Sequence, residues 1–259
     1  MLFKFFALYL TLILIAALSN LANSTEEDGS KFPTKIDAVM LTTGKDTRVF
    51  VKSIASALKH LVDVDKFYII SPNLAELKKN LGNNLNDRMI LLDERKFPFG
   101  GYNVSEVMIE SVRQRGVYPL DGNSQFEKTI WGRIGWFLQQ LLKFYAGRVF
   151  GLNDYVLLDS DLMWFKDVKF IAPRSNTTIT TPTKYFGNTY YYATSNQYHP
   201  SYIATLPRIS GLPLHNHKPV FRSGIVHHMV IVKTVLDSLI NVSEAKHGIP
   251  FWQILLNVR

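Results

Sequence analysis

The chain has 259 residues, of which 47% are hydrophobic and 19% charged, and this composition excludes a largely disordered protein. It contains no cysteine, which excludes disulfide bonds, thiolate metal sites and cysteine nucleophiles. The net charge of +8 comes from scattered basic residues without a long Lys/Arg block. This spread suits a phosphate-bearing ligand or an anionic membrane surface as well as nucleic acid, and by itself identifies none of them.

Residues 1–19 are predicted to be a targeting segment. Phe5 to Ala17 is apolar apart from one threonine, Lys4 supplies a positive flank, and the apolar run is shorter than the roughly 20 residues of a membrane span. Small residues from Ala17 to Ser19 favour a cleaved signal peptide. An uncleaved signal anchor, which would hold the protein at a membrane, and a buried N-terminal helix are the alternatives.

Either form of signal would send the chain into the secretory pathway, to the lumen of the Golgi or endoplasmic reticulum or to secretion. Residues 20–34 are polar and are predicted to be a linker to one domain at 35–259. Four glycosylation triplets agree modestly with this compartment; they begin at Asn23, Asn103, Asn176 and Asn241.

The first half of the domain alternates between strand and helix patterns. Apolar runs predict strands, and an apolar stripe on one helical face predicts the first helix, with Asp46 as its N-cap. The order is strand 36–42, a helix after Asp46, strand 66–71, helix 74–81 and strand 88–92. This β-α-β-α-β order predicts an α/β domain with a mostly parallel sheet and right-handed crossovers.

The first predicted strand ends in the turn Thr42-Thr43-Gly44. The turn contains neither the Gly-x-Gly-x-x-Gly pattern of dinucleotide-binding proteins nor a Walker loop, so both classes are disfavoured. In a parallel sheet this turn would lie at the C-terminal edge, together with the residues that directly follow the other strands.

A helix is also possible over 105–115, and a capping box at Ser124–Glu127 predicts the start of a long helix that runs to about Val149. Arg133 and Lys143 lie on this second helix and would offset phosphate charge near the sheet edge. The alternative is that both are solvated surface residues.

The strongest functional signal follows this helix. Tyr155 to Leu158 is a continuous apolar run, typical of a strand buried on both faces, and Asp159 and Asp161 come directly after it. On an extended chain these two carboxylates would point to the same side. Two adjacent carboxylates favour a hard cation such as Mg²⁺ or Mn²⁺, which commonly also holds a diphosphate. The alternative is a pair of solvated loop residues.

The last third of the chain gives weaker signals. Residues 177–198 are rich in threonine and aromatic residues, which fits a sugar site or an ordinary packed β segment. A helix is predicted over 235–240. Because adjacent residues cannot share one face, one of His227 and His228 is expected in the site and the other packed; a purely structural role for either is the alternative.

Taken together, these segments resemble nucleotide-sugar glycosyltransferases of the GT-A fold, and most closely a group of predicted glycosyltransferases of the DUF6492 type. The Asp-x-Asp alone is shared by many GT-A families, and the ordered set is more specific. The segments that carry the resemblance are Gly135–Lys143, Tyr155–Asp161, Tyr198–Pro200, His227–Met229 and Pro250–Trp252.

The resemblance implies a GT-A-like, Rossmann-type fold and a divalent metal, held by Asp159 and Asp161, that bridges the diphosphate of a nucleotide-sugar donor. It places donor contacts at Thr42, Thr43, Arg133, Gln140, Lys143 and Ser160. His227 and His228 would be catalytic, on the acceptor side, or would complete the metal shell. The acceptor would be a glycan, protein or lipid, and no nucleic-acid partner is expected.

One departure matters. Chains of this group continue beyond the segment that corresponds to Pro250–Trp252, whereas this sequence stops at Arg259, so a C-terminal truncation that removes activity is an open expectation. Two other functions therefore remain: a catalytically inactive GT-A-like domain that binds glycans or nucleotides, and a metal-dependent phosphohydrolase. The second is disfavoured because the Asp pair follows a late strand.

Overall fold

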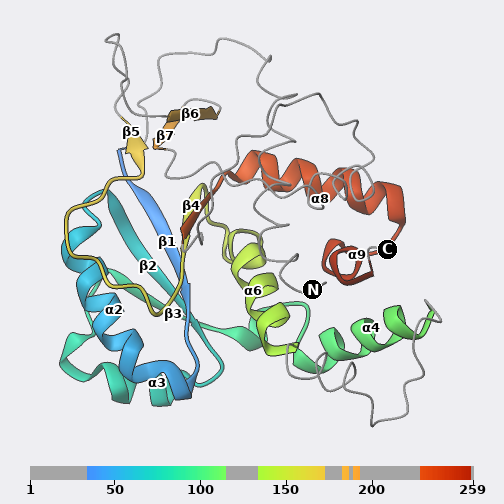
Figure 1. Ribbon diagram of the computed structural model, residues 1–259, viewed down its shortest axis with the longest axis horizontal. Coiled ribbons are helices and arrows are strands. Elements are labelled where there is room, and N and C mark those ends of the chain that lie inside the picture. Colours follow the sequence, from blue (N-terminus) through green and yellow to red (C-terminus); the bar gives the residue numbers. More distant parts are fainter. Residues whose placement is uncertain (1–33, 115–133, 173–182, 187–188, 193–227, 258–259) are drawn as a thin grey trace.

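The computed structural model of the protein describes residues 34–114, 134–172, 183–186, 189–192 and 228–257. They form an α/β, Rossmann-like domain with a five-stranded, mostly parallel sheet flanked by helices (Figure 1). The sheet order is β3-β2-β1-β4-β8. Strands β1 to β4 are parallel and β8 is antiparallel to β4. The predicted α/β fold with a mostly parallel sheet is therefore confirmed.

The bounds of the strands agree closely with the apolar runs of the sequence. The main sheet contains β1 (Ile36–Leu41), β2 (Val64–Ser71), β3 (Met89–Asp93), β4 (Tyr155–Leu158) and β8 (His228–Ile231). A small antiparallel sheet has the order β5-β7-β6, from β5 (Ile171–Ala172), β6 (Thr183–Phe186) and β7 (Thr189–Tyr192).

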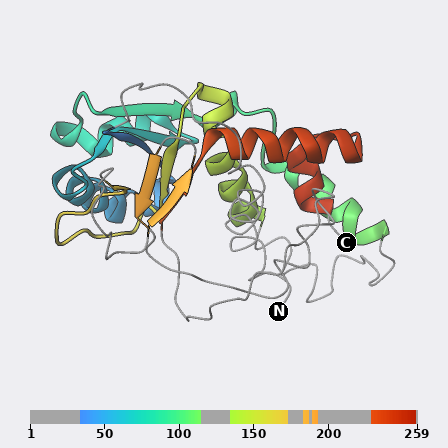
Figure 2. The same ribbon diagram turned by 90° about the horizontal axis from the view of Figure 1, so that it is seen from above.

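The described helices are α2 (Thr47–His60), α3 (Leu74–Leu81), α4 (Gly101–Gln114), α6 (Ile134–Phe150), α8 (Lys233–His247) and α9 (Phe251–Asn257). Short 3₁₀ turns are η2 (Gly44–Asp46), η3 (Gly82–Asn84) and η4 (Glu94–Lys96). In two perpendicular views α2 and α3 lie at one end of the molecule and α4, α8 and α9 at the other (Figures 1 and 2). No helix of the described part is long and apolar enough to cross a membrane.

The order of the strands reverses direction at β1. From β1 the chain moves outward through α2, β2 and α3 to the edge strand β3, and then returns past α4 and α6 to place β4 on the other side of β1. Right-handed crossovers put the helices of the outward and return paths on opposite faces of the sheet. Helix α6 packs against β1 on the return face.

Continuous apolar sequence explains the two central strands. All four residues of β4 and five of the six in β1 are buried, as expected for strands covered on both faces. On α2, Phe50, Ile54 and Ala57 are each fully buried and recur at helical spacing, which confirms the predicted apolar stripe.

Helix α6 is fastened to β4 at its C-terminal half. The Tyr155 hydroxyl lies 2.8 Å from the carbonyl oxygen of Phe144 and 3.3 Å from that of Lys143, and it donates to this pair of carbonyls. Gly147 faces the same ring, and a Cβ at Gly147 would lie 2.6 Å from Tyr155 Cε1. Gly151 then ends the helix at φ +67°, and Leu152 N donates to Gly147 O in a Schellman-type closure.

One local prediction is confirmed in position only, and another is wrong at its start. Asp46 occupies the N-cap position of α2, but its carboxylate accepts from the Thr43 hydroxyl at 2.7 Å and makes no capping bond to the helix. The 3₁₀ turn η2, which comes first, changes the approach to the helix. Helix α4 begins at Gly101, four residues before the predicted start at 105, because Asn103 Oδ1 accepts from the Gly100 N–H and organises its first turn.

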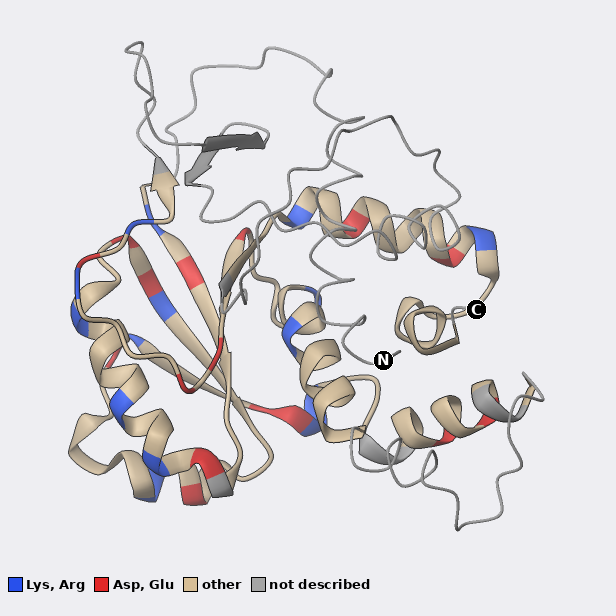
Figure 3. Cartoon of the chain, viewed as in Figure 1, with Lys and Arg blue, Asp and Glu red and all other residues tan. Residues whose placement is uncertain are grey.

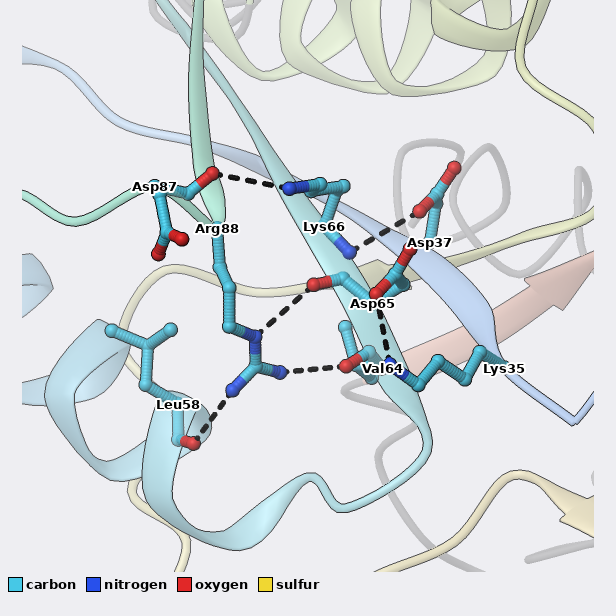
Figure 4. Close-up of polar contacts among 8 residues, drawn as sticks. All are labelled: Lys35, Asp37, Leu58, Val64, Asp65, Lys66, Asp87 and Arg88. Atoms are coloured by element: carbon cyan, nitrogen blue, oxygen red, sulfur yellow. Dashed lines mark hydrogen bonds and ion pairs between the residues drawn. The ribbon is translucent and has the colours of Figure 1, made fainter.

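At the edge of the sheet where the parallel strands begin, the Arg88 side chain binds the backbone at the start of β2 (Figure 4). Its guanidinium donates to the carbonyls of Leu58, Val64 and Asp65 at 3.1, 2.6 and 3.1 Å. Because Leu58 is in the last turn of α2, one of these bonds satisfies a carbonyl that has no partner within the helix. Arg88 therefore ties α2, β2 and β3 together.

Candidate functional site

Several of the residues predicted for the site follow the C-terminal ends of β1 and β4. Met40 of β1 is in register with Leu158 of β4, so Thr42 and Asp159 follow two neighbouring parallel strands. The strand order reverses between these strands. Open α/β sheets bind ligands in the crevice at such a reversal.

Asp159 is paired with Lys143 at this edge. Lys143 Nζ donates to Asp159 Oδ1 at 2.6 Å, and the side chains are 9% and 39% exposed. A nearly buried ammonium is costly without an anionic partner, so the contact neutralises Lys143 as well as Asp159. Lys143 is thus directed at the site and is not a solvated surface residue.

Ser160 and Asp161 lie in a turn beyond the end of β4. Ser160 is half-buried and Asp161 is exposed. The strand ends at Leu158, so the extended-chain argument that directed Asp159 and Asp161 to one side does not hold. The turn changes the direction of the chain immediately after Asp159, and the two carboxylates differ in environment.

Thr42 and Thr43 are placed beside this turn by β1. Thr42 is 2% exposed, and its N–H extends the ladder to β2 by donating to Ile70 O at 3.0 Å. Thr43 is half-buried, and its hydroxyl donates to Asp46 Oδ2. The Thr43 hydroxyl is therefore committed to Asp46 in this conformation.

The remaining predicted residues divide into two groups. Gln140 is half-buried on α6, one helical turn before Lys143. His228 begins β8 and pairs in register with Leu158, which places its backbone one residue from the start of the Asp159 turn. Arg133 and His227 lie outside the described residues, as does the capping box at 124–127.

Carboxylate oxygens are the donors that this edge offers to a cation. Asp159 and Asp161 offer hard carboxylate oxygens, which Mg²⁺ and Mn²⁺ prefer. Among the described residues no group of three or more His, Cys, Asp or Glu could hold a metal. Two carboxylates with phosphate oxygens and water are a common way to bind Mg²⁺, whereas a permanent structural ion needs more protein ligands.

A hollow at the end of β3 was not predicted from the sequence. It has a volume of about 370 Å³, which falls within the range of small-molecule sites. Glu94 and Arg95 directly follow β3, so the hollow lies beyond the C-terminal end of that strand, and Leu142 of α6 also lines it. Its full lining is Glu94, Arg95, Phe97, Pro98, Phe99, Gly100, Asn103, Leu138 and Leu142.

Charged residues mark the rim of this hollow. Hydrogen bonds from Arg95 hold the pKa of Asp93 down at about 2. Burial, and then the nearby charge of Asp93, raise the pKa of Glu94. The run Asp93-Glu94-Arg95-Lys96 after a parallel strand is the signal from which this part of the edge could have been predicted.

Comparison with known proteins gives a family without an activity. No curated protein matches the chain. One family model matches residues 34–203, well over half of the chain, and its description is "family of unknown function (DUF6492)". The match agrees with the part of the sequence resemblance that concerned this group. The chain therefore belongs to the DUF6492 family.

Proposed function

We propose that the protein is a metal-dependent glycosyltransferase that takes a sugar from a nucleotide-sugar donor. The observation that carries this proposal is the opposed pair of Asp159 and Lys143 at the strand-order reversal. A diphosphate with its cation needs both signs of charge in one place. The carboxylate suits the cation and the ammonium suits the phosphate oxygens.

Asp159 and Asp161 would hold the divalent ion, Mn²⁺ or Mg²⁺. Such an ion supplies Lewis-acid stabilisation of the charge that develops on the leaving nucleoside diphosphate. The protein side chains bind and orient the donor. The hollow lined by Phe97, Phe99 and Leu142 offers room for its nucleoside part, with Glu94 and Asn103 as hydrogen-bonding groups at its edge.

Lys143 has a defined task in this proposal. When Asp159 turns to a cation, the nearly buried ammonium loses its partner and must find another anion. A diphosphate oxygen would supply that anion within hydrogen-bond reach. Exchange of Lys143 from Asp159 to the diphosphate would couple cation binding to donor binding, so that each strengthens the other.

The acceptor side would lie beyond β4, toward β8. His228 is brought to this side by its register with Leu158, and His227 precedes it in the sequence. We propose that one of them contacts the acceptor or the cation. The acceptor would be a glycan, protein or lipid in the lumen of the secretory pathway, in keeping with the N-terminal signal expected from the sequence.

A second candidate is a catalytically inactive domain that binds a nucleotide or glycan. The Lys143–Asp159 contact favours it specifically, because the ammonium already occupies one oxygen of the principal metal ligand. In this alternative Lys143 is the resident cation and the site binds a nucleotide without a metal. A phosphohydrolase has no comparable support, because the Asp pair follows β4 and not the first strand.

A transfer assay separates these candidates. The full chain is incubated with a panel of sugar nucleotides and of glycan, peptide and lipid acceptors, with Mn²⁺ or with a chelator. Water takes the sugar where no acceptor fits, and the released nucleoside diphosphate is measured. An active transferase releases it from at least one donor only with the metal, and Asp159→Asn and Asp161→Asn abolish the release. Asp65→Asn, which removes a carboxylate at the opposite edge of the sheet, is the control and should retain it. Metal-independent binding without release would favour the inactive domain instead.

A further inference from the structure

The segment Leu162–Lys169 forms an exposed surface together with α2. Its backbone is fixed along the helix: Trp164 N donates to Ser56 Oγ at 3.1 Å, and Val168 N donates to His60 O at 2.9 Å. Asp167 also pairs with His60 at 2.9 Å. The segment is therefore held in a defined position beside the second half of α2.

Its far end is fixed as firmly. Asp63 is 6% exposed, and its Oδ2 accepts from the backbone N–H groups of Phe170 and Ile171 at 2.7 and 2.8 Å. The ring of Phe170 is 2% exposed and meets Trp164 edge-on, with centroids 6.3 Å apart. Trp164 and Phe170 thus anchor the segment inward, and the side chains between them extend from a backbone that is hydrogen-bonded at both ends.

Phe165, which lies between these anchors, is turned outward. Its side chain is 85% exposed, and Met163 and Val62 are 44% and 45% exposed. Phe165 has the highest exposure of the large hydrophobic residues in the described part. An aromatic ring held out in water by a well-anchored segment costs free energy, which contact with an apolar phase would recover.

Four exposed lysines lie on the two elements that form this surface. Lys52 and Lys59 lie four residues before and three after Ser56, so they share its face of α2, and Lys166 and Lys169 belong to the segment. All four are exposed, and none forms an ion pair with a described residue. Basic positions follow both α2 and the segment beside it in Figure 3. The one acidic side chain of the segment, Asp167, is engaged by His60.

We propose that this α2–segment surface (Lys52, Lys59, Val62, Met163, Phe165, Lys166 and Lys169) docks on an anionic lipid bilayer. Phe165 and Met163 enter the interfacial zone, and the lysines contact the lipid headgroups. Charge argues against a second copy of the chain as the occupant, because two such basic faces would repel each other. An exposed aromatic ring near long, flexible lysine side chains also fits a deformable anionic lipid surface better than a protein pocket of fixed shape.

This inference does not depend on sugar transfer, and it would hold if the Asp159 site bound nothing. It has a consequence for orientation, because the segment begins directly after Asp161. Docking would place the candidate site at the margin of the bilayer, with α8 on the far side of the molecule (Figure 1).

The absence of cysteine makes a local test straightforward. The full chain receives a single cysteine by Phe165→Cys, is labelled with an environment-sensitive fluorophore, and is mixed with vesicles of phosphatidylcholine with or without phosphatidylserine. Val242→Cys on α8, where the native side chain is 40% exposed, is the matched control. Any contribution of residues 1–19 affects both labelled chains equally.

The proposal predicts a blue-shifted, quencher-protected signal at position 165, only with phosphatidylserine, and no change at position 242. Lys52→Glu with Lys59→Glu should weaken partitioning by roughly tenfold or more. The control variant Lys233→Glu with Lys246→Glu makes the same change of charge on α8. It should leave partitioning onto the vesicles nearly unaltered. The proposal is overturned by no shift with either vesicle, by equal shifts at both positions, or by a shift that appears without vesicles and grows with protein concentration. The last result would identify a second copy as the occupant.

Discussion

Lys143 Nζ lies 2.6 Å from Asp159 Oδ1, and this contact joins α6 to the end of β4 at the reversal of strand order. The Tyr155 hydroxyl holds the backbone of α6 at Lys143 and Phe144 from the start of the same strand. One short strand therefore fixes both the carboxylate and the lysine that faces it.

Removal of the Lys143 charge should affect the two components of the proposed ligand differently. Lys143→Met removes the ammonium that contacts Asp159 Oδ1 and competes with a cation for it, so Mn²⁺ alone should bind at least as well as to the wild type. Loss of a charged hydrogen bond to phosphate, about 1.5–3 kcal/mol, should weaken Mn²⁺–nucleoside diphosphate binding roughly tenfold to a hundredfold. Titration calorimetry measures both. Lys143→Arg, which keeps the charge, should retain most of the affinity, and unchanged diphosphate binding in Lys143→Met would remove Lys143 from the site.

The two glycines of α6 should respond in opposite directions to alanine. At Gly147 a Cβ would lie 2.6 Å from the Tyr155 ring, so Gly147→Ala should lower the free energy of unfolding by about 1–3 kcal/mol. At Gly135 nothing lies within 4 Å of a Cβ, and Gly135→Ala should raise it by about 0.5–1 kcal/mol through better helix propensity. Urea denaturation measures both. A neutral Gly147→Ala would mean that α6 and β4 are not held together at this point.

Arg88 should be the most sensitive charged residue at the opposite edge of the sheet. Arg88→Met leaves three carbonyls without their donor and should destabilise the fold by about 2–4 kcal/mol. Lys66→Met, in the same region, removes one exposed bond to Asp87 O and should cost less than about 1 kcal/mol. If the two variants lose equal stability in thermal denaturation, the Arg88 hydrogen bonds drawn in Figure 4 do not contribute the stability assigned to them.

Asp37 should make the stability depend on pH. Burial raises its pKa, partly opposed by the hydrogen bond from Lys66 N, and the charge of Asp65 raises it further. For a carboxyl whose pKa is higher in the folded state, the favourable contribution is complete below the unfolded-state pKa and is lost as pH rises through the folded-state pKa. Asp37→Asn should therefore be more stable than the wild type at pH 7, with the difference vanishing near pH 3. Urea melts across this range test the sign, and a less stable Asp37→Asn at pH 7 would refute it.

The framework was predictable because it rests on local pattern. Strands β1, β2, β3 and β4 are apolar runs that end at turn residues, and α3 has the predicted bounds of 74–81. Their alternation with helices determines a parallel sheet, and the position of Thr42 and Asp159 at its C-terminal edge follows from that. The reversal between β1 and β4 was not foreseen, because strand order depends on long-range packing that periodicity does not encode.

The side-chain contacts of the site were harder to predict from the sequence than the fold was. Lys143 was placed near the edge, but its contact with Asp159 depends on how α6 crosses β1, which no local pattern gives. The turn at Ser160 and Asp161 removed the basis for directing the two carboxylates to one side. Glu94 and the hollow beside it were missed, although a charged run after a parallel strand indicated them. No local pattern marks Phe165 as a surface residue, and its 85% exposed side chain in the structure identifies it as one.

The most direct test of the central claim is the stabilisation of the full chain by nucleoside diphosphates in the presence of Mn²⁺. At a ligand concentration of about 100 times Kd the stabilisation is about 2.7 kcal/mol, or a rise in Tm of roughly 5–10 °C for a domain of this size. We predict such a rise for at least one diphosphate with Mn²⁺, its loss with a chelator, and its loss in Asp159→Asn and Asp161→Asn but not in Asp65→Asn. A rise that survives both the chelator and the Asp159→Asn substitution would contradict a cation held at the end of β4.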